Sequence, residues 1–245
     1  AMIGLQGRSL TKDTIPESNL VFLIDVSGSM NQADKIELLK DGFKMMVNQL
    51  RPEEKISIVT YAGNAAVLLD SVSGAEKQKI LSAIDQLNAG GSTAGAQGIL
   101  TAYELARKNF IPGGNNRVIL ATDGDFNIGV SSDGELVRLI EERRKDGIFL
   151  TVLGFGMGNY KDGKMEKLAD KGNGNYYYID TELEAKKVMV RELGSTLFTI
   201  AKDVKLQIEF NPAQVKAYRL IGYENRKLNK EDFNDDTKDA GELGA

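Results

Sequence analysis

Short apolar runs that recur along the chain constrain its fold more than any other feature. The first run, Leu20 to Ile24, contains no polar residue and ends at Asp25, a pattern typical of a strand buried on both faces of a parallel sheet. Later runs rich in β-branched and aromatic residues predict further strands. These runs are 55–61, 117–122, 148–153 and 175–179.

Segments with helical periodicity alternate with these runs. After the first run, apolar residues such as Ile36, Leu39 and Phe43 recur at three- and four-residue spacing, and the stripe stops before Pro52. A Ser, Thr or Asp followed three residues later by Glu predicts a capped helix start. Such pairs are Asp34/Glu37, Ser73/Glu76, Ser132/Glu135 and Thr181/Glu184. The predicted helices span about 34–50, 75–87, 93–110, 133–145 and 182–200.

Strands that alternate with helices at this spacing predict a doubly wound α/β fold. Its sheet is expected to be mostly parallel, with helices on both faces and right-handed crossovers. One connection differs, because Ala62-Gly63-Asn64-Ala65 joins the run 55–61 to 66–70 through a Gly-Asn pair that is typical of a tight hairpin. We therefore expect one antiparallel strand at an edge of the sheet.

The two ends of the chain follow a different pattern. Residues 204–210 alternate apolar with polar side chains and 215–221 forms a second run, which predicts strands without helices. Because two strands are marginal alone, we expect residues 2–5 to join them in a small β appendage. The predicted parts are an N-terminal segment, 1–16, an α/β domain, 17–201, and a C-terminal β extension with an acidic loop, 202–245, which we expect to be truncated.

Composition excludes several functions. The chain has no cysteine and no histidine, so thiolate chemistry, imidazole zinc sites and Ser/His/Asp triads are ruled out, and any metal must bind to oxygen. Acidic and basic residues are scattered at a formal net charge of −4, which leaves no basic block for nucleic acid. No segment approaches the roughly 20 apolar residues that span a bilayer, and residues 1–10 lack the layout of a signal peptide.

Carboxylates and hydroxyls gather where the predicted strands end. The first strand leads into Asp25, Ser27 and Ser29 at alternate positions, the fourth leads into Asp123, and a Gly-Gly-Ser loop places Thr93 at a helix start. In open α/β sheets, ligands bind beyond the carboxyl ends of the strands, so these residues are expected at one rim. Such oxygens suit a hard cation such as Mg²⁺. Two carboxylates and three neutral hydroxyls leave the cation able to accept a further anionic ligand.

This set resembles the metal-ion-dependent adhesion site of the von Willebrand factor A domains, whose pattern is Asp-x-Ser-x-Ser, then Thr, then Asp. The likeness covers roughly residues 19–200 and implies their Rossmann-like fold. By the resemblance, Ser27 and Ser29 bind the ion directly, while Asp25 and Asp123 bind it directly or through water. Thr93 would enter or leave the coordination sphere.

A narrower likeness points to a group of bacterial von Willebrand A proteins often made as exported lipoproteins. The stretches that carry it are 20–30, 90–95, 121–127, 154–161 and the tail 204–225. It implies an extracytoplasmic or membrane-anchored location for the full-length protein. Three further residues, Asp125, Met157 and Tyr160, are candidates for the rim of the binding face. The alternative of an ordinary exposed turn residue fits Asp125 better, while packing against the domain fits Met157 and Tyr160 equally well.

The resemblance implies a binding module and not an enzyme. In this interpretation Mg²⁺, with Mn²⁺ and Ca²⁺ as alternatives, coordinates an Asp or Glu of a partner protein. A Mg²⁺-dependent phosphohydrolase with Asp25 as nucleophile is one alternative, but such enzymes usually carry a second acid where Ser27 stands. A scaffold with a vestigial metal site is the other. The sequence does not indicate the partner or the oligomeric state.

Overall fold

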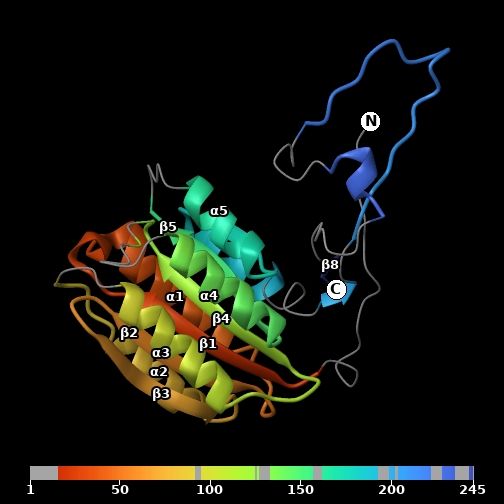
Figure 1. The fold of residues 1–245 in the computed structure, drawn as a ribbon. Coiled ribbons are helices and arrows are strands. Elements are labelled where there is room, and N and C mark those ends of the chain that lie inside the picture. The colour runs from red at the N-terminus through yellow and green to blue at the C-terminus, as the bar shows by residue number, and fades with distance from the viewer. Residues whose placement is uncertain are drawn as a thin grey trace.

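A six-stranded sheet forms the centre of the protein, seen in a computed structural model (Figure 1). The structure describes residues 16–91, 95–124, 126, 133–156, 162–192, 199–201, 204–221, 228–234 and 243–244. The strands are β1 (Ser18–Asp25), β2 (Lys55–Tyr61), β3 (Ala65–Ser73), β4 (Asn115–Thr122), β5 (Ile148–Phe155) and β6 (Tyr176–Ile179). Their order is β3-β2-β1-β4-β5-β6. The doubly wound, mostly parallel fold predicted from the sequence is thus confirmed.

The expected hairpin is also confirmed. β3 pairs antiparallel with β2 at the edge of the sheet, whereas β1, β2, β4, β5 and β6 pair in parallel. The strand extends three residues beyond the predicted 66–70 toward the carboxyl side and reaches Ser73. Parallel pairing needs crossover helices, which place one layer of helices on each face.

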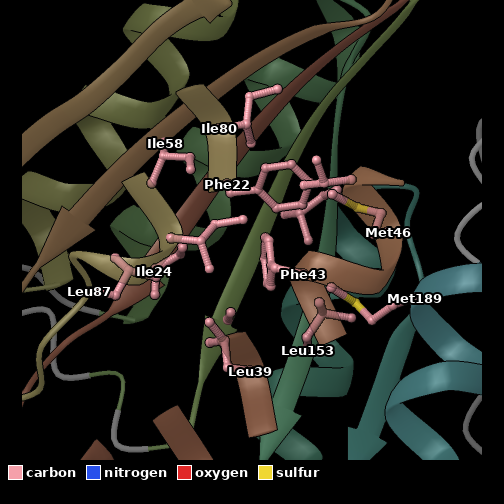
Figure 2. Close-up of a cluster of buried hydrophobic side chains, with 14 of the residues drawn as sticks. Phe22, Ile24, Leu39, Phe43, Met46, Ile58, Ile80, Leu87, Leu153 and Met189 are labelled. Atoms are coloured by element: carbon pink, nitrogen blue, oxygen red, sulfur yellow. The ribbon is translucent and has the colours of Figure 1, made fainter. Parts of the chain in front are cut away.

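Alternate side chains of β1 feed two separate hydrophobic cores, because successive residues of a strand point to opposite faces. Phe22 and Ile24 pack with helices α1 (Leu38–Val47) and α2 (Lys77–Asp85) on one face (Figure 2). Val21 and Leu23 pack on the other face. The helices there are α3 (Gly95–Lys108), α4 (Asp133–Lys145) and α5 (Asp162–Lys171). All eight residues of β1 are buried, so its end is held rigidly from both sides.

Only some predicted helix starts use the expected cap. Thr181 caps α6 (Glu182–Lys186) by accepting a hydrogen bond from the Glu184 backbone N–H at 3.3 Å, as predicted. The Asp34/Glu37 box was wrong. The first helix begins with a π-helical turn, η3 (Ala33–Glu37), and Glu37 pairs instead with Lys40. α2 begins at Lys77 with Glu76 as the N-cap residue, so the Ser73 cap was wrong too.

The last predicted helix is shorter than expected. α6 continues as a π-helix, η4 (Lys187–Glu192), but residues Thr199–Ala201 form strand β7 and not the end of a helix. β7 pairs antiparallel with β8 (Leu243–Gly244) in a separate two-stranded sheet. The β-branched residues of this short segment favour a strand once a partner is present.

The two predicted strands at 204–210 and 215–221 are absent from this described part of the chain, which is irregular apart from a turn (Figure 1). Most of their large apolar side chains are exposed in the described structure; Leu206 is 58% exposed and Ile221 is 78% exposed. Alternation forms a stable strand only when one face is buried, which explains the error. The expected strand at 2–5 lies outside the described residues. Among the residues with assigned structure, no helix is both long enough and apolar enough to cross a membrane.

Candidate metal centre

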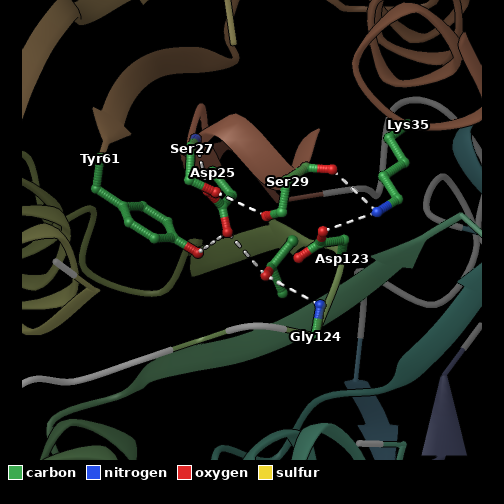
Figure 3. A network of polar contacts seen from close by, with 8 residues as sticks. Asp25, Ser27, Ser29, Lys35, Tyr61, Asp123 and Gly124 are labelled. Atoms are coloured by element: carbon green, nitrogen blue, oxygen red, sulfur yellow. Dashed lines mark hydrogen bonds and ion pairs between the residues drawn. The ribbon is translucent and has the colours of Figure 1, made fainter. Parts of the chain in front are cut away.

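The predicted oxygen ligands lie at the carboxyl ends of β1 and β4, at the point where the strand order reverses (Figure 3). β1 lies between β2 and β4, its last residue is Asp25, and Asp123 directly follows β4. Crossovers leave neighbouring strands toward opposite faces at this point, which opens space beyond the strand ends. Four of the five predicted ligands, Asp25, Ser27, Ser29 and Asp123, lie in the described part of the structure and come together here.

Asp25 is the buried centre of the polar network. Its side chain accepts three hydrogen bonds: from the Ser27 backbone N–H at 2.9 Å, from the Tyr61 hydroxyl at 3.0 Å and from the Thr122 hydroxyl at 3.1 Å. Burial raises the pKa of Asp25 above its ordinary value, and the nearby Asp123 charge adds to this effect, although the hydrogen bonds from Ser27 and Tyr61 oppose it. The network therefore fixes the orientation of a carboxylate that water does not stabilise.

The two serines stand side by side in the turn after β1. Ser27 Oγ and Ser29 Oγ are 3.0 Å apart, and Ser27 is 1% exposed. This turn is a short 3-10 helix, η2 (Gly28–Met30). Alternate residues of the turn thus bring two hydroxyl oxygens to one place beside Asp25, as the Asp-x-Ser-x-Ser spacing predicts.

A neighbouring loop is attached to this turn through backbone hydrogen bonds. Gly28 N donates to Gly91 O at 3.1 Å, and Gly90 N donates to Val26 O at 2.7 Å. Gly91 has φ +87°, a conformation that favours glycine, and a Cβ on Gly28 would lie 3.4 Å from Gly91 O. The loop that leads toward Thr93 is therefore held against the Asp25 turn.

Thr93 itself lies outside the described residues, as do the three predicted rim residues Asp125, Met157 and Tyr160. The positions of these four remain predictions. The described backbone of this loop ends at Gly91, which lies against the turn after β1.

Lys35 joins the network from the start of the first helix, which the sequence reasoning missed. Its ammonium group donates to Asp123 Oδ2 at 2.9 Å and to Ser29 O at 3.0 Å. The side chains of Lys35 and Asp123 are only 14% and 5% exposed. A positive charge on a predicted amphipathic helix gave no signal of this role, because the approach of Lys35 depends on the tertiary fold.

Tyr61 and Thr122 were missed as well, but a signal for them existed in the strand pattern. They are the last residues of β2 and β4, the two strands that flank β1, and Tyr61 stands opposite Asp25 in the parallel register. Residues at the ends of neighbouring parallel strands meet at one edge. A comparison of strand ends would therefore have placed both hydroxyls beside Asp25.

The donor set fits a hard divalent cation. It consists of two carboxylates and two hydroxyls at one end of the sheet, all of them oxygen ligands that Mg²⁺ prefers. In the described part of the chain no three His, Cys, Asp or Glu residues are grouped as a metal site would require, so a cation here would depend on the serine hydroxyls. Those hydroxyls lie as close together as one ion needs them.

Comparison with known families identifies the domain that carries this site. The model of the von Willebrand factor type A domain matches residues 19–192, from β1 to the end of η4. The chain belongs to the von Willebrand factor type A family. Beyond this von Willebrand A domain, residues 195–245 match the model "Uncharacterized protein YfbK, C-terminal". The resemblance inferred from the sequence is therefore confirmed at the level of the family.

Similar proteins place the von Willebrand A domain in longer chains. "Uncharacterized protein YfbK" of Escherichia coli K12 is 48% identical over 243 residues, which are 99% of this chain but 42% of that protein. The chain thus spans less than half of this relative. A von Willebrand factor type A structure from Catenulispora acidiphila aligns with a TM-score of 0.64 at 21% identity, over 78% of this chain and 44% of the other.

A mussel byssus protein, proximal thread matrix protein 1, is also similar. Its structure aligns with a TM-score of 0.55 at 26% identity, over 71% of this chain and 44% of the other. Another structure of that protein is described as having a zinc-occupied MIDAS motif, the metal-ion-dependent adhesion site.

Tyr61→Phe is expected to lower the free energy of unfolding of the von Willebrand A domain by roughly 1 to 2 kcal/mol, because it removes a donor from the buried Asp25 carboxylate. The ring would keep its edge contact with Phe126. Tyr103→Phe is the matched control. Its buried hydroxyl has no hydrogen-bond partner among the described residues, so its loss should be neutral or stabilising. Urea denaturation of both variants checks this, and equal losses would contradict the role given to Tyr61.

Proposed function

We propose that this von Willebrand A domain binds one divalent cation through Asp25, Ser27, Ser29 and Asp123, with Thr93 as the fifth ligand. The observation that supports the proposal most directly is the buried Asp25 carboxylate, held by three donors beside the paired Ser27 and Ser29 hydroxyls. Burying a carboxylate in this way costs stability unless a cation or donors compensate for it. A bound dication would provide that compensation.

We further propose that the cation takes a carboxylate of a partner protein. Neutral hydroxyls supply half of the described ligands, so the ion would keep enough positive charge to attract an acidic side chain. Mg²⁺ is the cation we expect, with Mn²⁺ or Ca²⁺ as alternatives, and the zinc in the similar mussel protein supports a divalent ion in general. An extracytoplasmic or membrane-anchored location remains a prediction from family resemblance.

The geometry favours binding over catalysis. An aspartyl nucleophile needs an oxygen that can reach a substrate, yet Asp25 is fully buried and both of its oxygens accept hydrogen bonds. The position where a phosphohydrolase would supply its second acid is Ser27. We therefore propose that the protein is an interaction module and not an enzyme that acts through Asp25.

Calorimetric titration with MgCl₂ or MnCl₂ tests the proposal. We expect one site in the wild type and a loss of affinity of about tenfold or more in Ser27→Ala, because a ligand oxygen is removed. Ser18→Ala is the control at the opposite end of the same strand. The Ser18 hydroxyl is buried and has no hydrogen-bond partner within the described residues, so the variant should bind metal like the wild type.

Binding of a partner carboxylate to the ion can be measured separately, by water-proton relaxation. Bound Mn²⁺ enhances the relaxation of water protons, and an acidic peptide that replaces a coordinated water should reduce this enhancement. A peptide with Gln in place of Glu should leave it unchanged. Wild-type protein that binds no divalent cation would refute the proposed function, and equal effects of both peptides would refute its carboxylate step.

A further inference from the structure

We propose that Lys35 is a resident cation of the metal centre, which competes with the divalent ion for Asp123 and thereby weakens metal binding. This inference rests on the proposed function. It starts from the two short contacts of the Lys35 ammonium group, with the Asp123 carboxylate and with the backbone oxygen of Ser29 (Figure 3). Both contacts involve residues of the predicted ligand set.

The burial of this ion pair makes the competition strong. The side chains of Lys35 and Asp123 are 14% and 5% exposed, so solvent screens their attraction much less than it screens the surface pairs of the protein. Asp123 Oδ2 cannot give its full charge to a divalent ion while the ammonium group stays 2.9 Å away. Metal binding at Asp123 must therefore displace Lys35 or accept its repulsion.

The absence of a side chain at Gly156 leaves room for the Lys35 side chain. Gly156, which follows β5, has φ +90°, and a Cβ at this position would lie 2.7 Å from Lys35 Cε and 2.8 Å from Lys35 Cγ. A side chain at this position would force the lysine stem to move away from its observed place. Lys35 itself belongs to the π-helical turn η3, and such turns occur frequently at functional sites. Two features in separate segments thus direct one ammonium group to the metal centre.

Charge balance gives the direction of the effect. The two carboxylates and Lys35 together carry one negative charge, and a bound dication would change this to one positive charge. Without Lys35 the same site would change from two negative charges to neutrality. Because an ion binds more tightly to a more negative site, removal of the lysine charge should strengthen metal binding.

The test compares metal affinities in protein freed of metal with EDTA and then dialysed. Lys35→Met keeps most of the stem over Gly156 and removes the charge, and Lys35→Gln is a second neutral variant. We expect both to bind Mg²⁺ and Mn²⁺ about tenfold more tightly than the wild type in calorimetry. Lys44→Met is the control. Lys44 pairs with Asp85 on the surface, away from the ligands, so its loss should leave the affinity within about twofold.

The outcomes separate this inference from the proposed function. Unchanged or weaker binding in both Lys35 variants, with normal binding by the wild type, overturns the inference alone. No binding by the wild type or by any variant overturns the inference and the proposed function together. A neutral variant that unfolds in metal-free buffer and refolds with Mg²⁺ supports the inference, because metal then replaces the missing charge. Unfolding that Mg²⁺ does not reverse overturns it, since Lys35 would then serve the fold alone.

Discussion

Gly174→Ala is expected to lower the free energy of unfolding by about 4 kcal/mol, which is a large part of the stability of a typical domain. Gly174 lies between α5 and β6, and a Cβ there would overlap the carbonyl oxygen of Leu150 and lie 2.5 Å from its carbonyl carbon. Leu150 is fully buried in the middle of β5. The obstacle is therefore backbone in the centre of the sheet, which cannot move aside as a flexible side chain could.

Hydrogen bonds also prevent the Gly174 loop from moving. Gly174 N donates to Ala169 O at 3.0 Å, and the strand beside it is attached through Leu150 N to Gly172 O and Val152 N to Asn175 O, both at 2.9 Å. A shift that relieved the collision would break several of these bonds. The substitution should therefore lower stability whichever way the structure responds.

Gly163→Ala provides the matched control on α5. None of the described residues lies within 4 Å of a Cβ at this exposed helical position, so alanine should stabilise the protein by about 0.5 kcal/mol through the lower entropy of its unfolded chain. Urea denaturation should then show a decrease in the free energy of unfolding for Gly174→Ala and an increase for Gly163→Ala. A loss below about 1 kcal/mol in Gly174→Ala would show that the close approach has been overestimated.

Asp25→Asn is expected to abolish metal binding, with a loss of affinity of about a hundredfold or more, while the fold persists. The amide oxygen can accept the Ser27 backbone N–H, and the amide nitrogen can donate to the hydroxyl oxygens of Tyr61 and Thr122 once these protons turn away. The network thus survives without the negative charge. Asp25→Ala, in contrast, leaves three donors without an acceptor and should cost about 3 kcal/mol of stability.

Without metal, Asp25→Asn should be at least as stable as the wild type at neutral pH. Burial raises the pKa of Asp25 in the folded protein, so the folded state binds a proton more readily than the unfolded state. The free energy of unfolding therefore falls as the pH rises from the ordinary pKa of an aspartate to the raised pKa of Asp25 in the folded protein. The full loss is present at any pH above the raised pKa. Asparagine avoids this cost.

Thermal denaturation with and without Mg²⁺ checks both parts of this prediction. The wild type should gain stability with added metal, because a ligand of the folded state shifts the equilibrium, whereas Asp25→Asn should not. A metal-dependent gain in the asparagine variant would show that Asp25 is not a ligand. Metal-free Asp25→Asn that is clearly less stable than the wild type would show that the buried charge is not costly.

Most of the fold class was predictable because the strands and their alternation with helices leave local patterns in the sequence. Wholly apolar runs specified the central strands to within two or three residues, and the Gly-Asn pair specified the antiparallel edge. Helix starts were less predictable. The Asp34/Glu37 pair had the right spacing for a cap, but the first turn is π-helical and its Lys35 contacts Asp123 in the metal centre. Tertiary contacts of this kind leave no periodic signal in the sequence.

In the irregular tail, a strand pattern was present in the sequence but no strand formed in its described residues. Residues 204–221 have the alternation of a strand, yet most of their large apolar side chains are exposed in this structure. Alternation tells which side chains could share a face but not whether anything covers that face. In the site, spacing alone brought Asp25, Ser27 and Ser29 together. Tyr61 and Thr122, which hold Asp25, could have been found from the ends of the neighbouring strands, whereas Lys35, which pairs with Asp123, depends on the tertiary fold.

The backbone attachment between the Gly90-Gly91 loop and the turn after β1 has a consequence for the thermodynamics of binding. Because Gly28 N and Gly90 N are both engaged across the two loops, this half of the site is ordered before any ion arrives. Ordering free loops costs conformational entropy, and preorganisation removes that cost from the binding equilibrium. The favourable free energy of ion binding is then available for drawing in an acidic partner.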